Sequence, residues 1–254
     1  MSQRRFVLAV CALAIASATW AGPAVAQSKN IEQAAVANTE LALAYMREGN
    51  LAAARDKIEK ALTQNSRTAR TQMAAGIIYD RLNNRRKAQT HFEQAVKLGK
   101  DDPDVLNNAA VYLCRYGDYK RGEQFLLQSA ASPLNRTPDV AYTNAGRCAR
   151  ANQRPQEAEQ YFRRALATNP KQAEALLQMA EVSLAANNGL QARAFLERYS
   201  AVATVTPSTL MLGRRIEMGL GDSAQAQRYA QRIKDEFPMS AEAGQLFDEE
   251  QAKP

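Results

Sequence analysis

Few side chains in this sequence of 254 residues have the types and spacing that enzyme chemistry needs. His91 is the single histidine, and no cluster of cysteines or carboxylates at metal-ligand spacing accompanies it. The sequence contains neither a phosphate-binding glycine loop nor a nucleophile elbow. We therefore expect His91 to lie on an exposed helix face, and we expect no enzymatic activity, cofactor, metal or small-molecule substrate.

Asp101, Asp102 and Asp104 form a short acidic run of a kind that could bind calcium. The run surrounds Pro103 and lies between two segments of helical periodicity, where aspartate commonly caps the next helix. We interpret the run as a solvated helix cap.

Cys114 and Cys148 offer a different chemistry, oxidation to a disulfide. They are 34 residues apart, and the absence of a CxxC motif disfavours a catalytic redox role. Whether they can pair depends on the compartment and on the elements that carry them.

The first 26 residues have the features of an export signal. Arg4 and Arg5 precede an apolar run, and Ala24-Val25-Ala26 fits a small-x-small cleavage site. We expect cleavage before Gln27, a mature chain in the periplasm, and a short linker over residues 27–34. An exported chain with two remaining cysteines permits a disulfide.

The composition is that of an ordinary folded protein. The chain is 46% apolar and 23% charged, which disfavours a disordered or collagen-like chain. Its net charge of +7 falls to about +5 without residues 1–26, which hold two arginines and no acids. A mildly basic surface without interleaved aromatic residues is a poor match for a nucleic-acid-binding protein.

A spacing close to 34 residues recurs along the rest of the chain. Polar turns start at Gly49, Asn83, Gly117, Gln153, Asn187 and Gly221. Five positions after each start stands a small residue, namely Ala54, Ala88, Gly122, Ala158, Ala192 and Ala226. The sequence therefore contains six copies of one helix-turn-helix unit.

The second helix of each unit carries a buried stripe, because offsets of four and three residues place side chains on one helix face. The clearest stripes, which we expect to pack the repeats together, are Ala54, Ile58 and Ala61, then Ala88, Phe92 and Ala95, then Ala158, Phe162 and Ala165. One helix pair has too little core to stand alone, so each stripe must also pack on the neighbouring unit.

A 34-residue unit with this small, aromatic, small pattern and a closing proline, as at Pro170 and Pro238, resembles the tetratricopeptide repeat. The resemblance implies an all-α fold, a right-handed superhelix or α-solenoid of about six repeats. We place the repeats at 35–68, 69–102, 103–138, 139–172, 173–206 and 207–242, followed by a C-terminal tail over 243–254. The sixth repeat needs one inserted residue between Gly213 and Ala226.

In this array Cys114 and Cys148 lie near the ends of the first helices of neighbouring repeats. Such helices pack side by side, so the two Cα atoms can approach the roughly 4.4–6.8 Å that a disulfide requires. We favour a disulfide, with two separate buried thiols as the alternative.

The first helices of such an array line a concave groove that can hold an extended or helical peptide. The residues that we expect to contact a partner lie on the exposed side of the first helices: Thr39, Leu43, Met73, Ile77, Asn107, Val111, Thr143, Arg147, Leu177 and Glu181. Arg47, Arg81 and Arg115 recur every 34 residues at the ends of these helices. We interpret them as cations that favour the helix C-terminus, with a ladder for an acidic ligand as the alternative.

Beyond the repeat, the chain resembles the PilF/PilW family of type IV pilus biogenesis proteins, the pilotins of the pilus secretin. The most specific parts are VLNNAAVYL at 105–113 and VAYTNAG at 140–146 with the loop before it, and the likeness covers roughly residues 35–240. Cys114 and Cys148 also look like the cysteine pair found in part of that family. The resemblance implies a periplasmic scaffold that binds secretin subunits and assists their assembly or stability at the outer membrane.

Many pilotins are lipoproteins, but Val10 stands before Cys11 where a lipobox prefers a small residue. We therefore expect no lipid anchor, and membrane association only through partners. The alternative function is a general periplasmic repeat adaptor for cell-envelope or peptidoglycan-related complexes.

Overall fold

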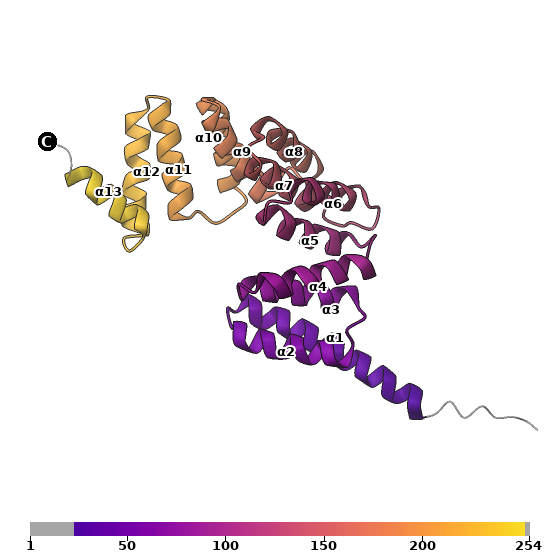
Figure 1. Ribbon diagram of the computed structural model, residues 1–254. Coiled ribbons are helices and arrows are strands. Elements are labelled where there is room, and N and C mark those ends of the chain that lie inside the picture. Colours follow the sequence, from indigo (N-terminus) through magenta and orange to yellow (C-terminus); the bar gives the residue numbers. More distant parts are fainter. Residues whose placement is uncertain (1–22, 252–254) are drawn as a thin grey trace, which may run out of the picture.

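The structure of the protein is a computed structural model that describes residues 23–251. Most of the predicted export signal, including Cys11, and residues 252–254 lie outside the described residues. The described part holds 13 α-helices and no strand. Most of the helices stack in antiparallel pairs to form a curved array (Figure 1). The predicted all-α array is therefore confirmed.

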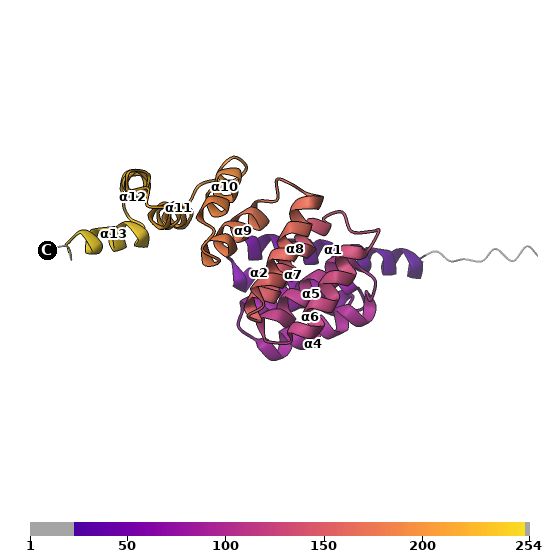
Figure 2. The same cartoon turned by 90° about the horizontal axis from the view of Figure 1, so that it is seen from above.

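Six pairs follow one another along the chain. The first helices of the pairs are α1 (Pro23–Arg47), α3 (Ala69–Arg81), α5 (Pro103–Arg115), α7 (Pro138–Ala151), α9 (Ala173–Ala185) and α11 (Pro207–Gly219). The second helices are α2 (Leu51–Gln64), α4 (Arg85–Leu98), α6 (Tyr119–Ala131), α8 (Pro155–Thr168), α10 (Gly189–Ser200) and α12 (Ser223–Glu236). A final helix, α13 (Ala241–Gln251), ends the array. Seen from above, α11 to α13 extend away from the block that α1 to α8 form (Figure 2).

Two segments differ from the sequence expectation. Residues 27–34, expected to be a linker, are helical and belong to α1, because the two glutamines, the lysine, the glutamate and the alanine there favour a helix and no glycine or proline interrupts them. The expected tail after residue 242 is mostly helix α13. Ala243 and Leu246 of this helix are buried in a cluster with Leu210, Met211 and Ile233, so α13 covers the end of the core.

The hairpin turns determine where the first helix of each pair ends and where the second begins. The residues at the six predicted turn starts all have a positive φ, from 57° at the three without glycine to 90° at Gly117. Glycine and asparagine tolerate this left-handed conformation, and Gln153 is the exception. In five of the six turns the next residue caps the second helix through its side chain, namely Asn50, Asn84, Asp118, Asn188 and Asp222. In the fourth turn Pro155 starts the helix instead.

The predicted packing stripes lie in the core. All nine stripe residues are buried, and Phe162 is fully buried. Glycines on the first helices let the aromatic rings approach closely: a Cβ at Gly76 would lie 2.9 Å from the ring of Phe92, and one at Gly146 would overlap the ring of Phe162. The cluster that contains Phe162 continues into α9 and on to α11, so the stripe packs on its own pair and on the next.

The sixth pair keeps the same contact with a shifted turn. Gly213 faces the ring of Tyr229, and these residues are 16 positions apart, like Gly76 and Phe92. The turn residue Gly221 comes eight positions after Gly213, against seven in the second and fourth pairs. The extra residue therefore lies in α11, before the turn.

We predict that Phe162→Ala lowers the free energy of unfolding by about 3–5 kcal/mol, because the substitution empties a fully buried ring site. Phe247→Ala is the matched control, since that ring on α13 is 58% exposed. Its effect should stay within about 0.5 kcal/mol. Urea denaturation followed by circular dichroism measures both. Equal effects of the two substitutions would contradict the packing described here.

Candidate partner-binding surfaces

Four of the ten expected groove residues are buried, which corrects the prediction that they face a partner. Thr39, Leu43, Met73 and Thr143 are 1%, 9%, 7% and 2% exposed. A first helix packs on its own second helix and on the adjacent pairs, so a wider arc of its surface is covered than in an isolated hairpin. Thr39 Oγ1 lies 3.0 Å from Oγ1 of Thr71 on the next first helix. Leu43 and Met73 belong to the buried cluster that spans the first three pairs.

The other six expected groove residues are at least partly exposed: Ile77, Asn107, Val111, Arg147, Leu177 and Glu181. Three of them lie where adjacent first helices meet. The amide of Asn144 donates to Oδ1 of Asn107 at 3.0 Å, which links α5 to α7. Arg147 and Glu181 line a shallow depression of about 410 Å³ between α7 and α9. This stretch of first helices is the candidate concave binding surface.

Arginines mark the junctions between pairs. Arg115 lies at the end of α5 and pairs with Asp80 on the preceding first helix, α3. It therefore joins its own repeat to the one before it. Arg47 and Arg81 lie in the last turns of α1 and α3, as the helix-end interpretation predicts. Ion pairs of this type join each pair to the next element: Arg70–Glu40 (2.7 Å), Arg115–Asp80, Arg154–Glu123 (2.5 Å), Arg150–Glu181 (2.6 Å), Arg193–Glu217 and Arg214–Glu249 (2.7 Å).

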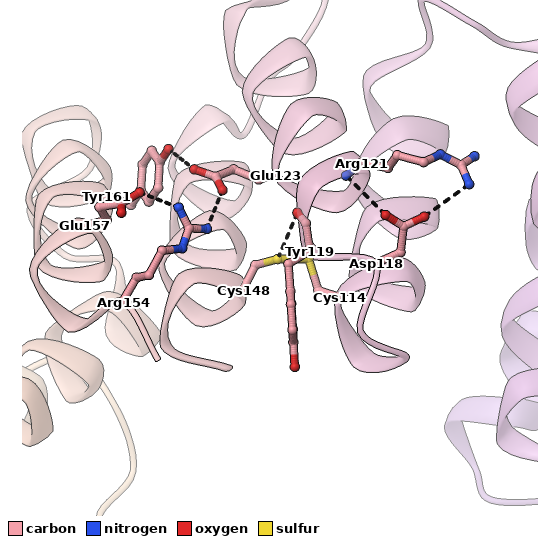
Figure 3. A network of polar contacts seen from close by, with 9 residues as sticks. All are labelled: Cys114, Asp118, Tyr119, Arg121, Glu123, Cys148, Arg154, Glu157 and Tyr161. Carbon is pink, nitrogen blue, oxygen red and sulfur yellow. Dashed lines mark hydrogen bonds and ion pairs between the residues drawn. A yellow bond between two sulfur atoms is a disulfide. The ribbon is translucent and has the colours of Figure 1, made fainter. Parts of the chain in front are cut away.

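A disulfide joins Cys114 on α5 to Cys148 on α7, with the Cα atoms 5.4 Å apart (Figure 3). Both cysteines are buried. Gly122 stands where the repeat normally has alanine, and a Cβ at this position would overlap Sγ of Cys114. The missing side chain thus makes room for the disulfide, so the third repeat is adapted at this position.

A polar network beside the disulfide ties α6 to α8 (Figure 3). Glu123 accepts hydrogen bonds from the Arg154 guanidinium and the Tyr161 hydroxyl, and Arg154 also pairs with Glu157. Burial, together with the Glu123 carboxylate, raises the pKa of Tyr161 to about 12. Tyr161 therefore keeps its proton at neutral pH and acts as a fixed donor, which is a structural role.

His91 is half-buried, which corrects the expectation of an exposed surface histidine. Its ring stacks on Tyr79, with the centroids 5.3 Å apart, and Nδ1 lies 2.7 Å from Oε1 of Gln72. Burial and then the Lys87 charge lower the pKa of His91, so it is neutral at pH 7. Among residues 23–251 no group of three or more potential ligands could hold a metal ion.

The acidic run has the predicted capping role. Asp102 is the N-cap of α5, and its carboxylate accepts from the backbone N–H of Asp104 at 2.9 Å.

A cleft between α4, α5 and α6 was not predicted from the sequence. It has a volume of about 450 Å³ and several aromatic walls, including Tyr112, Tyr116 and Phe125. The sequence feature that could have indicated this cleft is the third repeat's higher number of aromatic residues than either neighbouring repeat has.

Models of the tetratricopeptide repeat family match residues 73–135 and 149–208. The chain therefore contains tetratricopeptide repeats. It is homologous to the type IV pilus assembly protein PilF of Pseudomonas aeruginosa, with 24% identity over 214 residues that cover 84% of this chain and 85% of PilF.

Solved structures agree with this relationship. The crystal structure of PilW, described as a widely conserved type IV pilus biogenesis factor, matches with a TM-score of 0.77 and 28% identity over 85% of this chain and 99% of PilW. The structure of P. aeruginosa PilF matches with a TM-score of 0.73 and 23% identity over 87% of this chain and 99% of PilF. The chain therefore shares the superhelical fold of PilF and PilW. None of its described helices is long and apolar enough to cross a membrane.

We predict that the chain beginning at residue 27 has no free thiol when it is denatured without reductant, and two after reduction. The double variant Cys114→Ser with Cys148→Ser should lose about 2–4 kcal/mol of unfolding free energy, because the unfolded chain regains the freedom of a loop of 34 residues. Dithiothreitol should bring the wild-type protein to the stability of the double variant and leave the variant unchanged. Two free thiols before reduction would show that the pair is not formed.

Proposed function

We propose that this protein is a non-catalytic scaffold in type IV pilus biogenesis, which binds subunits of the outer-membrane secretin and assists their assembly. The observation that carries the proposal is the extent of the likeness: the chain aligns with 99% of the PilW structure at 28% identity. An alignment of that length shows that the two proteins share the order and arrangement of the repeats as well as the single repeat unit. The secretin as partner comes from the family resemblance.

The concave surface supplies the physical means of binding. Asn107 and Asn144 present amide groups from adjacent first helices, and Arg147 and Glu181 present opposite charges at the depression. A partner segment in this groove meets hydrogen-bonding groups, charges and the partly exposed apolar side chain of Leu177. Such a surface fits a peptide segment of mixed polarity.

The same proposal places the protein in the periplasm, in association with the outer membrane through its partner. A disulfide is compatible with that oxidising compartment and would be unusual in the cytosol. The N-terminal sequence, with its basic start, apolar run and Ala24-Val25-Ala26, is the second support.

We predict that the protein purified from the cell envelope begins at Gln27. Mass spectrometry of its N-terminal peptide measures this directly. A diacylglyceryl group on Cys11 would contradict the prediction and would instead make the protein a membrane-anchored lipoprotein. A retained residue 1 in the envelope-free fraction would contradict export itself.

We predict that affinity capture from envelope extracts enriches the secretin. Arg147→Glu should reduce the captured secretin about fivefold or more, since it reverses an exposed charge at the depression. Arg163→Glu is the matched control: the same change at an exposed arginine of second helix α8, expected to leave capture within about twofold. Circular dichroism should show both variants to be folded.

Enrichment of peptidoglycan enzymes in place of the secretin would overturn the proposal. That result would support the alternative, a general periplasmic adaptor.

A further inference from the structure

The cleft between α4, α5 and α6 lies on a different side of the array from the concave surface. Its floor on α5 includes Ala109, Tyr112 and Leu113. The groove residues Asn107 and Val111 belong to the same helix, but the period of 3.6 residues places them on roughly the opposite face. A partner in the cleft would therefore not compete for space with a partner in the concave groove.

The walls of the cleft are apolar because their polar atoms are already bonded. The rings of Phe92 and Tyr112 lie 4.9 Å apart, and those of Tyr112 and Tyr116 lie 4.7 Å apart. The Tyr112 hydroxyl donates to the backbone oxygen of Arg85 at 3.0 Å, and the Tyr116 hydroxyl donates to Asp80 at 2.9 Å. Aromatic faces are thus presented to the cleft while both hydroxyls are satisfied, which suits apolar side chains.

The rim of the cleft is basic. Arg121 pairs with Asp118 at 3.2 Å, so these two charges offset each other. Arg85 stacks over the Tyr116 ring at 4.4 Å, and Lys97 lies at the other end of the α4 side. Within residues 23–251 neither Arg85 nor Lys97 has a carboxylate at ion-pair distance. Glu93 is the one other acidic residue that lines the cleft. The net charge of the residues at the rim is therefore positive.

We propose that this cleft binds an amphipathic helix of a partner protein, with apolar side chains on one face and carboxylates at both ends. The volume of about 450 Å³ is within the range of about 300–1,000 Å³ typical of binding pockets. Two helices over a third form the kind of groove in which a helix lays its apolar face. Unpaired cations lie at both ends of the α4 wall, so charge complementarity favours a partner helix with carboxylates at both ends.

The spacing of the two cations sets the length of the helix. Arg85 and Lys97 are 12 residues apart on α4, which corresponds to about 18 Å along the helix axis. A partner helix that reaches both cations therefore needs carboxylates about 12 residues apart, with apolar anchors at positions i, i+3 or i+4, and i+7 between them.

The test uses the full mature chain and a fluorescein-labelled peptide of about 14 residues, with leucine and phenylalanine on one face and glutamate at both ends. A second peptide has lysine in place of each glutamate. Fluorescence anisotropy should show that the acidic peptide binds at least about tenfold more tightly than the basic one, and that added salt weakens its binding.

Lys97→Glu should weaken binding of the acidic peptide at least about fivefold. Arg86→Glu is the matched control, because it makes the same charge change on α4 at an exposed residue that does not line the cleft. It should leave the affinity within about twofold. Leu113→Glu, which places a charge on the floor, should abolish binding. Lys97→Glu alone keeps the test decisive if Leu113→Glu fails to fold.

Three results would overturn the inference. One is equal affinity for the acidic and basic peptides, or equal effects of Lys97→Glu and Arg86→Glu. Another is displacement of the peptide by a dansyl-labelled fatty acid at lower concentration than by unlabelled peptide, which would assign the cleft to a lipid chain. The third is self-association in sedimentation velocity that Lys97→Glu removes. That result would assign the cleft to a second copy, whose exposed Phe247 lies beside Asp248 on α13.

Discussion

The rest of the structure depends on one constraint: no helix pair here can bury its own apolar face. Ile58, Phe92 and Phe162 are buried because each stripe is covered from both sides, by its own first helix and by the neighbouring pair. Stability in such an array is close to a sum of pair and junction terms. The ion pairs between repeats contribute little stability, about 0–1 kcal/mol for each exposed pair. They add specificity instead, because each forms only when the correct repeat is its neighbour.

The two junctions on either side of the third pair are packed differently. Between the third and fourth pairs, a disulfide, Gly122 and the network around Glu123 draw α5 to α8 together (Figure 3). Between the second and third pairs, the rings of Phe92, Tyr112 and Tyr116 pack on one another and line the aromatic cleft between α4, α5 and α6. The hydroxyls of Tyr112 and Tyr116 donate hydrogen bonds to acceptors in the second pair. The cleft therefore leaves neither hydroxyl without a hydrogen-bond acceptor.

Periodic features of the fold could be predicted from the sequence, because they repeat within every unit. The turn starts, the buried stripes and the all-α array follow from local spacing and from the tolerance of glycine and asparagine for positive φ. Features that depend on how one unit meets the next could not. Thr39 and Thr143 have the sequence character of exposed residues, yet the neighbouring pairs cover them. The ion-pair partners of Arg115 and Arg150 lie more than 30 positions away. The walls of the cleft come from two different pairs, so they meet only in the assembled array.

The position of the disulfide matters for both candidate surfaces. The cleft is formed by α4 to α6 and the concave depression by α7 and α9, so the junction between α5 and α7 lies between them. A cross-link there fixes the angle at which the two surfaces are presented, because packed junctions between rigid helices bend by sliding and a covalent bond prevents the slide. Partners bound on the two surfaces would then be held in a fixed relative orientation. That control of geometry is the property on which the proposed assembly role depends.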